Sequence, residues 1–259
     1  MKDGKSLQSG TSHFFGDGFA RAFDIQYTGR DNQLHTPFET SWGVSTRLIG
    51  AIIMTHGDNN GLVLPPDVAP IQAVIIPVAQ HKEGVLEKAA ELKASLEAAG
   101  IRVKLDDSNN SAGWKYSEYE MKGVPVRIEV GPRDIENNQC VIVTRHNREK
   151  SFVSLDNLAD TVSEKLTEVR EGIYNKALEN RENRTYACTT MDEITKALNE
   201  KGDGFIKAMW CGEEACEDKV KEETGVGSRC IPLQQENLSD VCVCCGKPAQ
   251  YMVYWGKAY

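Results

Sequence analysis

Short strands and helices alternate along the sequence from Ile71 to about residue 178, and this alternation limits the chain to few folds. The segment Ala73–Val78 is entirely apolar, which predicts a short strand. From Lys82 to Ala99, apolar side chains recur every three or four residues, which predicts an amphipathic helix. Gly100 follows and is suited to end that helix, because glycine readily adopts the left-handed conformation.

The same periodicity predicts further elements. We expect strands at Ile101–Leu105, Val124–Val130 and Cys140–Thr144, and helices at Ser111–Met121 and from Leu155 to at least Leu178. Strands that alternate with helices are typical of an α/β layer with a mostly parallel sheet.

Prolines mark a boundary before this region. Pro65 and Pro66 are adjacent and Pro70 follows closely, so regular structure is expected to stop here. Before the boundary we expect strand-like pieces around one buried helix, followed by a polar turn at His56–Gly61.

The composition is that of an ordinary globular protein, with 40% hydrophobic and 26% charged residues among 259. That length suits one large domain or two to three small ones. No apolar run approaches the ~20 residues that cross a bilayer, and the N-terminus lacks the apolar segment of a signal peptide. We therefore expect a cytoplasmic protein without a membrane partner. The net charge of −8 argues against non-specific coating of DNA or RNA, but it is compatible with recognition of one shape-defined RNA.

The last region, from about residue 185, is predicted to contain one helix, Met191–Asn199, and an aromatic tail that ends at Tyr259. Six of the eight cysteines also lie here, between Cys211 and Cys245. In a cytosolic chain, such a cluster favours a metal site over disulfides.

Two close cysteine pairs are separated by 25 residues, and their thiolates suit tetrahedral zinc with Zn–S distances of about 2.3 Å. The predicted ligands are Cys211, Cys216, Cys242 and Cys245. Cys244 competes for the fourth position through a Cys-x-Cys spacing, and Cys230 is a more distant alternative. We expect a structural Zn²⁺ that serves folding rather than catalysis, with a reduced, metal-free cluster as the alternative.

A second chemical feature lies in Ser41–Pro66. A strand of small residues runs into Arg47 and then into the apolar segment Leu48–Met54. Small side chains let a ligand approach the backbone closely, and a guanidinium offers a planar set of donors to phosphate. The pattern favours a flat, phosphate-bearing ligand on the strand, with a turn and a surface ion pair as the alternative.

Three motifs, in this order along the chain, resemble those of a known family. Gln8–His13 resembles the LQ-x-x-TSH segment of prolyl-tRNA synthetases of the archaeal and eukaryotic type. Ser41–Pro66 resembles the third class-defining motif of class II aminoacyl-tRNA synthetases, in the form found in the same family. Tyr119–Asp134 resembles the anticodon-domain signature of the family, and the similarity covers essentially all 259 residues.

This resemblance implies a multidomain α/β and α+β protein with three domains. Residues 1–68 would be the end of the class II antiparallel catalytic sheet. Residues 69–180 would form an α/β anticodon-binding domain with a five-stranded mixed sheet, and residues 181–259 a small α+β zinc-binding domain.

The resemblance also implies a site for ATP and proline. Adenylation needs arginine and Mg²⁺ to neutralise developing charge on ATP, and Arg47 matches the catalytic arginine of motif three. The positions that match ATP-binding residues are Gln8, Thr11, Ser45 and Arg47. The positions that match the proline pocket are His13, Ser41, Trp42 and Gly43, with Trp42 as a wall. Tyr259 resembles a terminal tyrosine that folds back toward this site.

Anticodon recognition is implied for the second domain. Proteins read single-stranded bases by stacking and by hydrogen bonds to their Watson–Crick edges, and the two guanines that end proline anticodons offer N–H donors to a carboxylate. The candidate residues are Glu120, Lys122, Arg127, Glu129, Arg133 and Arg145. Glu129 is the first choice for reading guanine because its strand neighbours are apolar. A solvated strand face with alternating charges is the alternative for any one of them.

Motifs one and two of class II synthetases cannot lie in the ten residues before Thr11. We therefore expect this chain to be a C-terminal piece that does not form prolyl-adenylate by itself. The intact enzyme would be a homodimeric proline–tRNA ligase that joins proline to tRNA-Pro with ATP and Mg²⁺. A stand-alone tRNA-binding module and a zinc-stabilised interaction protein without catalysis stay open as alternatives.

Overall fold

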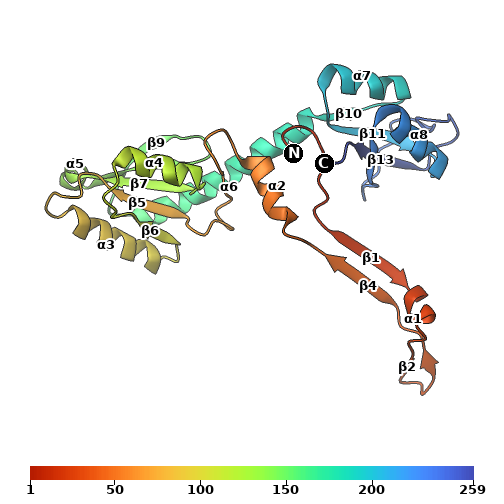
Figure 1. Cartoon of the computed structure of the whole chain (residues 1–259), viewed down its shortest axis with the longest axis horizontal. Helices are drawn as coiled ribbons and strands as arrows, with labels where there is room; N and C mark the ends of the chain where they lie inside the picture. Colours follow the sequence, from red (N-terminus) through yellow and green to blue (C-terminus); the bar gives the residue numbers. More distant parts are fainter. The chain divides into compact units, whose positions relative to one another are not determined.

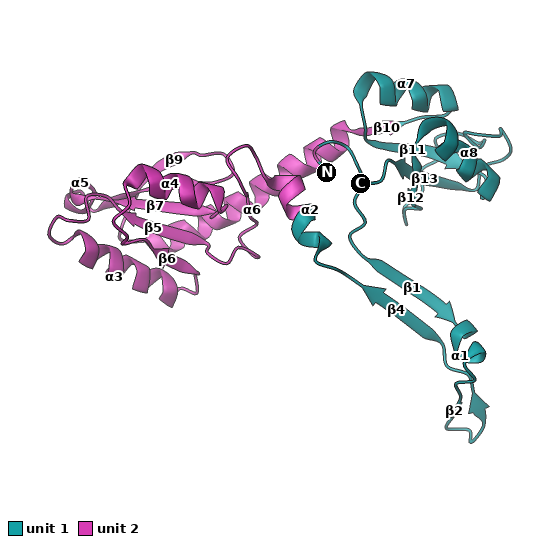
Figure 2. Ribbon diagram, in the orientation of Figure 1, with its two compact units in different colours: residues 1, 3–51, 187–259 teal, residues 2, 52–186 magenta.

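The computed structural model describes residues 1–259, and the chain divides into two compact units (Figure 2). One unit comprises residues 52–186 together with Lys2. The other comprises residues 3–51 and 187–259 together with Met1, so it joins two segments that are far apart in the sequence. The first boundary falls earlier than the predicted one at the prolines, because the residues that follow Ala51 pack with the α/β unit.

The unit of residues 52–186 is built on a five-stranded mixed sheet (Figure 1). Its strands lie in the spatial order β6 (Val103–Leu105), β5 (Ala73–Pro77), β7 (Val126–Val130), β8 (Gln139–Thr144) and β9 (Lys150–Ser154). β5 is parallel to both of its neighbours, whereas β7, β8 and β9 pair antiparallel. The predicted mixed sheet is therefore confirmed. Its second half is antiparallel because the connections there are too short for parallel crossovers.

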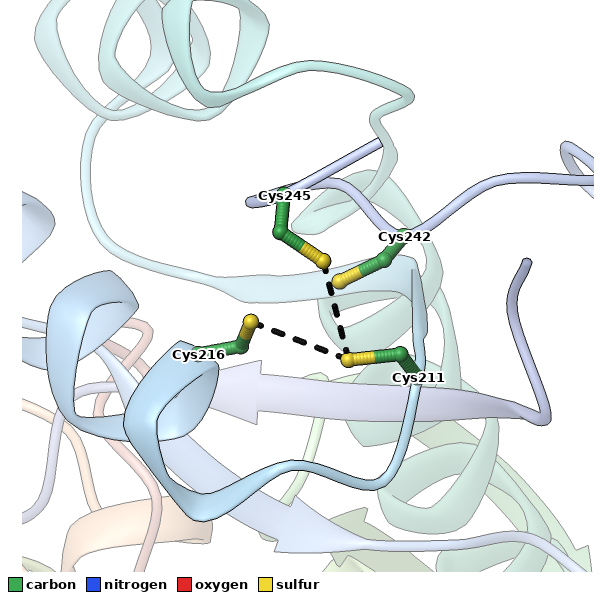
Figure 3. Close-up of side chains that lie close together, drawn as sticks. All are labelled: Cys211, Cys216, Cys242 and Cys245. Atoms are coloured by element: carbon green, nitrogen blue, oxygen red, sulfur yellow. Dashed lines mark hydrogen bonds between the residues drawn. The ribbon is translucent and has the colours of Figure 1, made fainter. Parts of the chain in front are cut away.

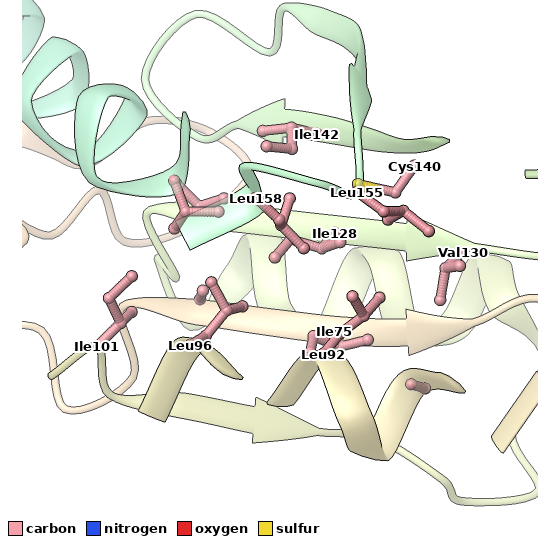
Figure 4. Packing of buried hydrophobic residues seen from close by; sticks show 14 of the residues in the cluster. Ile75, Leu92, Leu96, Ile101, Ile128, Val130, Cys140, Ile142, Leu155 and Leu158 are labelled. Carbon is pink, nitrogen blue, oxygen red and sulfur yellow. The ribbon is translucent and has the colours of Figure 1, made fainter. Parts of the chain in front are cut away.

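Helices cover both faces of this sheet. They are α3 (Val85–Ala98), α4 (Ala112–Met121), α5 (Pro132–Glu136) and α6 (Leu158–Asn183). α3 and α6 pack into the main core, where Figure 4 shows Leu92 and Leu158 on either side of Ile128. α4 belongs to a separate cluster in which Tyr119 packs against Val74. The first crossover runs from β5 to β6, and the second returns from β6 past β5 to β7. Because the two run in opposite directions, their common right-handedness places α3 and α4 on opposite faces.

The predicted elements of this unit agree with the structure except at two places. α5 occupies the connection between β7 and β8, for which no helix was predicted from the sequence. Gly131 precedes this helix and its N–H donates to the Asp134 carboxylate at 2.9 Å, so the Gly-Pro-Arg-Asp segment starts a helix rather than a simple turn. β9 was not placed from the sequence, although five strands were expected.

The helix of the apolar segment is half-buried rather than buried. α2 (Arg47–His56) has no buried residue, and Ile49 and Ile53 expose 63% and 44% of their surface. The prediction of a buried helix is therefore wrong for these 259 residues. Its apolar periodicity is real, but no residue described here covers that face completely.

The C-terminal part of the other unit forms a four-stranded sheet. Its strands lie in the order β10 (Thr185–Ala187), β11 (Phe205–Trp210), β13 (Tyr251–Gly256) and β12 (Gly227–Cys230). The helices here are α7 (Met191–Lys201) and α8 (Glu214–Thr224). Only α7 was predicted, and the aromatic tail is mainly a core strand, in which Met252 and Trp255 are fully buried.

The N-terminal part of the same unit is a hairpin with a short excursion at its tip. β1 (Thr11–Gly16) pairs antiparallel with β4 (Glu39–Gly43). Between them lie α1 (Gly18–Ala22), β2 (Tyr27–Thr28) and β3 (Leu34–His35). No helix in the chain combines the length and the apolar character that crossing a bilayer requires.

Candidate nucleic-acid interface and metal centre

A pocket lies on the α4 side of the sheet, over its antiparallel half. The strand register aligns Arg127 of β7 with Val143 of β8, and Val143 with Lys150 of β9. Directly opposed residues point to the same face of a sheet, so two positive side chains flank an apolar one. The three residues form one wall of what we call the base pocket.

The rest of the base pocket comes from the end of α4 and from the turn that links β8 to β9. Its full lining is Tyr119, Glu120, Val124, Arg127, Val143, Thr144, Arg145, Arg148 and Lys150. Glu120 is the carboxylate of this set, among four positively charged side chains. An apolar floor with one carboxylate and several cationic donors can hold a flat polar ring such as a nucleic-acid base.

Arg127 is held by neighbours on its own side of the sheet. Its guanidinium lies 4.3 Å from the centre of the Tyr116 ring, and its Nε donates to Glu129 at 2.9 Å. Burial, together with the Glu129 carboxylate, raises the pKa of Tyr116 to about 12. The arginine is thus fixed in place at the pocket edge rather than mobile in solvent.

The structure brings together only half of the anticodon candidates. Glu120, Arg127 and Arg145 line the base pocket, while Lys122, Glu129 and Arg133 do not. Glu129, the first choice for reading guanine, is 9% exposed and accepts from Arg127. The Glu129 carboxylate therefore has an internal partner and lies outside the pocket lining, and its role in reading guanine stays a prediction.

Two of the remaining candidates are also engaged within the chain. Lys122 pairs with Glu118 at 2.6 Å, one helical turn earlier. Arg145 lines the pocket, but its two terminal nitrogens donate to Asp58 at 2.6 and 2.8 Å. Both terminal nitrogens of Arg145 therefore have a partner within the chain.

Sequence reasoning missed Lys150 and Arg148. The signal for this strand is the adjacent pair of β-prone residues Phe152 and Val153, which follows a polar turn. With β9 in place, Lys150 falls on the face that carries Arg127.

Three of the four candidate ATP residues, Gln8, Ser45 and Arg47, lie near one another at the start of α2. Arg47 donates from Nη1 to Gln8 Oε1 at 3.4 Å, and its backbone N–H donates to the Ser45 hydroxyl at 3.3 Å. These contacts hold the arginine beside the hairpin. Its side chain remains exposed, as a phosphate-binding group requires.

The hairpin register separates the candidate proline residues into two groups. Thr11 opposes Gly43 and His13 opposes Ser41, so these four residues share one face. Trp42 opposes Ser12 and therefore points to the other face. The proposal that Trp42 forms a wall of the same pocket is not supported by this arrangement.

The C-terminal tail runs beside the segment that carries Gln8. Ala258 forms a parallel bridge with Ser6, and the N–H of Tyr259 donates to the Ser6 carbonyl at 3.0 Å. The Tyr259 side chain is exposed. The tail therefore folds back against the N-terminal segment, two residues before Gln8.

Four cysteines converge in the C-terminal part. In Figure 3 the sulfur atoms of Cys211, Cys216, Cys242 and Cys245 point toward one another, and all lie within 4.8 Å. The Cys211 sulfur is 3.7 Å from that of Cys216 and 3.8 Å from that of Cys245. Zinc bound tetrahedrally at about 2.3 Å separates its sulfur ligands by about 3.8 Å. The site fits zinc.

The alternative ligands are not in this group. Cys244 lies next to the cluster but is not among the four converging sulfurs, and Cys230 is exposed. Gly246 has a φ of +72°, which lets the turn after Cys245 close tightly. A backbone hydrogen bond from Lys247 lowers the pKa of the Cys245 thiol to about 7, which favours the thiolate that binds metal.

Comparison with known proteins connects these sites to one family. Residues 72–165 match the family described as anticodon binding domain, and residues 191–259 match the family described as prolyl-tRNA synthetase, C-terminal. The whole chain is 65% identical to the proline–tRNA ligase of Ruminiclostridium cellulolyticum. This chain belongs to the prolyl-tRNA synthetase family.

Other relatives give the same result. The chain is 61% identical to the proline–tRNA ligase of Lachnospira eligens and 60% identical to that of Clostridium botulinum, in each case over all 259 residues. It covers 54% of each of these proteins, so the chain spans about half the length of the curated relatives it matches.

The two family matches of this prolyl-tRNA synthetase chain contain the two best-defined sites. The anticodon-binding match includes every residue that lines the base pocket. The C-terminal match includes all four converging cysteines. The hairpin of β1 and β4 lies outside both matches, but the full-length alignments with the relatives extend across it.

Proposed function

We propose that this chain is the C-terminal part of a proline–tRNA ligase and that it recognises the anticodon of tRNA-Pro in the base pocket. The observation that carries the proposal is the pocket itself. Within the range that matches an anticodon-binding domain, a single carboxylate, Glu120, lines one pocket together with several cationic side chains and the apolar Val124 and Val143.

Guanine matches this chemistry. Its N1–H and N2 amine can donate to a carboxylate, which is the role we assign to Glu120. Its O6 and N7 accept from arginine or lysine, which is the role we assign to Arg127 or Lys150. Proline anticodons end in two guanines, so a pocket with both kinds of partner suits one of them. Tyr119 and Val143 supply apolar surface for contact with the flat ring.

We assign the hairpin to the adenylation site of the whole enzyme. Gln8, Ser45 and Arg47 would contact ATP, and Thr11, His13, Ser41 and Gly43 would form one wall for ATP and proline. Arg47 would neutralise charge on the phosphates, and the tRNA hydroxyl would attack a preformed adenylate, so no covalent nucleophile is needed. Mg²⁺ would add to this neutralisation in the whole enzyme, and no residue of this chain is assigned to it.

The same proposal includes a structural zinc, a homodimeric intact enzyme and a cytoplasmic location. Cys211, Cys216, Cys242 and Cys245 would hold the zinc with no open position, so the metal would serve folding. Reduced, clustered cysteines support an intracellular compartment. We further propose consecutive domains at residues 1–68, 69–180 and 181–259, which the two family matches support in part.

Binding of RNA to the 259-residue chain tests the proposal. We expect tRNA-Pro to bind more tightly than a control tRNA whose anticodon lacks the two guanines. Glu120→Gln should remove most of that preference, because the amide offers a donor where the carboxylate accepts. Glu87→Gln, a change at an exposed position of α3, is the matched control and should leave the preference intact. Equal affinity of the unmodified chain for both tRNAs would refute the anticodon assignment.

A further inference from the structure

The turn that follows α2, residues 57–61, is fitted against the end of α4. The Leu62 N–H donates to the Met121 carbonyl at 2.9 Å, and Gly61 has a φ of +133°. A methyl group at Gly61 would come within 2.4 Å of the Met121 carbonyl oxygen. Only glycine permits this approach, so the turn is built to lie beside Glu120, the residue before Met121.

Asp58 of this turn binds two arginines of the base pocket, Arg145 and Arg148. It accepts from Arg145 in a two-pronged contact at 2.6 and 2.8 Å, and from Arg148 at 3.3 Å. The Arg145 side chain is only 3% exposed, and its Nε donates to the Glu120 carbonyl at 2.9 Å. A two-pronged contact fixes the plane of a guanidinium as well as its position. Asp58 thus determines how Arg145 lies in the pocket wall.

Asn60 acts on the carboxylate itself. Its side-chain amide donates to Glu120 Oε1 at 2.9 Å, and Arg148 Nε approaches the same oxygen at 2.8 Å. The Asn60 backbone N–H donates to Asp58 at 2.9 Å, which links the two residues of the turn. Both contacts to Glu120 reach Oε1, and neither uses Oε2. The carboxylate is therefore held by one oxygen and can present the other to a ligand.

We propose that Asp58 and Asn60 are positioning residues of the base pocket, which orient Glu120 and Arg148 so that the pocket selects guanine over bases with other edges. This inference rests on the proposed function. It assigns selectivity to a turn that lies outside the range matched to the anticodon-binding domain.

A simpler role for the turn is a mechanical brace that holds the segment after α2 on the α/β unit. The two roles differ in their effect on the affinity for different RNAs. Loss of a brace lowers the affinity for every RNA by the same factor, because the pocket is then formed less often. Loss of orientation at Glu120 removes the preference for a base that donates from N1 and N2, because the carboxylate no longer meets those donors in one geometry.

The test uses the 259-residue chain and short anticodon stem-loop RNAs, with binding measured by fluorescence anisotropy. One RNA carries the proline anticodon, and two others carry inosine in place of each guanine in turn, which removes only the N2 amine. The measured quantity is the ratio of dissociation constants for the inosine and guanosine RNAs. The variants are Asp58→Asn, Asp58→Glu and Asn60→Ala.

Asp67→Asn is the matched control, because Asp67 makes a salt bridge with Arg170 in the same unit at 3.2 Å and lies outside the pocket. We expect the unmodified chain and this control to prefer guanosine at one anticodon position. Asp58→Asn and Asn60→Ala should lower that ratio about tenfold or abolish it, and Asp58→Glu should restore part of it. Asn60→Ala removes no charge from the Asp58–Arg145 pair. It therefore tests the orientation of Glu120 even if Asp58→Asn does not fold.

Two results would overturn the inference. Variants that lose affinity for all three RNAs by one common factor would show that the turn is only a brace. Variants that bind all three like the control would show that the turn does not act on the pocket. If the unmodified chain shows no preference for guanosine at either position, the proposed function itself fails and the inference fails with it.

Discussion

Removal of the metal from the four-cysteine site should unfold the C-terminal domain rather than merely loosen it. The structure allows the competing effects to be compared. A core in a domain below about 70–80 residues supplies roughly 3–5 kcal/mol, whereas a structural zinc contributes about 10–16 kcal/mol of apparent binding free energy at neutral pH. Residues 191–259 are a domain of this size class, with Cys211, Cys216 and Cys242 buried in the cluster. The free energy lost with the metal therefore exceeds the stability that the apolar core supplies.

Metal analysis together with amide hydrogen exchange measures this effect. We expect about one zinc per chain, in keeping with four sulfur ligands. Chelation or Cys216→Ser should release the zinc and expose the amides of β11 and β13 to exchange. The amides of β5 and β7 belong to the other unit, so their protection should persist and serves as an internal standard.

Cys230→Ser is the control, because Cys230 is exposed and lies outside the cluster. This variant should retain both the zinc and the protection of β11 and β13. The reasoning is refuted if a chain without bound metal protects these amides as well as the loaded chain does. Zinc retained in Cys245→Ser but lost in Cys244→Ser would instead move the fourth ligand to the neighbouring cysteine.

Three further predictions follow from individual contacts. Lys150→Ala should weaken binding of the anticodon RNA about tenfold in an anisotropy titration, while Lys93→Ala on α3 should bind like the unmodified chain. Because the pKa of Tyr116 is raised from 10.0 to about 12, the stability that its neutral phenol contributes is present below pH 10 and is lost as the pH rises toward 12. In urea unfolding, the free energy of unfolding of Tyr116→Phe should therefore decline less steeply at alkaline pH than that of the unmodified chain. An unchanged decline would contradict the pKa shift. Gly61→Ala should destabilise the α/β unit by about 2 kcal/mol or more in urea unfolding, because its methyl would meet the Met121 carbonyl, and a midpoint equal to that of the unmodified chain would show that the turn can shift.

The α/β unit was largely predictable because its signals are local. The apolar spacing in Val85–Ala98 depends only on neighbouring residues, and the same holds for the fully apolar β5. β9 was harder to find, since it is a five-residue edge strand in which Phe152 is 70% exposed and polar and apolar residues do not alternate. The C-terminal sheet was missed for a different reason. The aromatic run of β13 was interpreted as a tail because its burial comes from β11 and β12, which lie more than twenty residues away in the sequence.

The candidate site shows which parts of function need three-dimensional information. The cysteine spacing alone identified the four converging sulfurs, because tetrahedral coordination imposes a local pattern. The base pocket could not be assembled in that way. Lys150 joins Arg127 only through the register of three strands, and Glu129 was favoured because the sequence cannot show that Arg127 already occupies it. Charged residues in a motif identify a region, whereas their internal pairings determine which of them face a ligand.

The hairpin and the base pocket also differ in how complete they are within these residues. The base pocket has a buried arginine, a held carboxylate and a packed floor, so its geometry is set by the unit around it. The hairpin is a two-stranded sheet with Phe14 and Trp42 each more than 70% exposed on one face, and a two-stranded sheet alone is marginally stable in water. Its apolar faces are better explained as surfaces that further strands cover in a longer protein. The N-terminal motifs therefore support adenylation by the whole enzyme, while the proposed anticodon selection can be tested in this chain by itself.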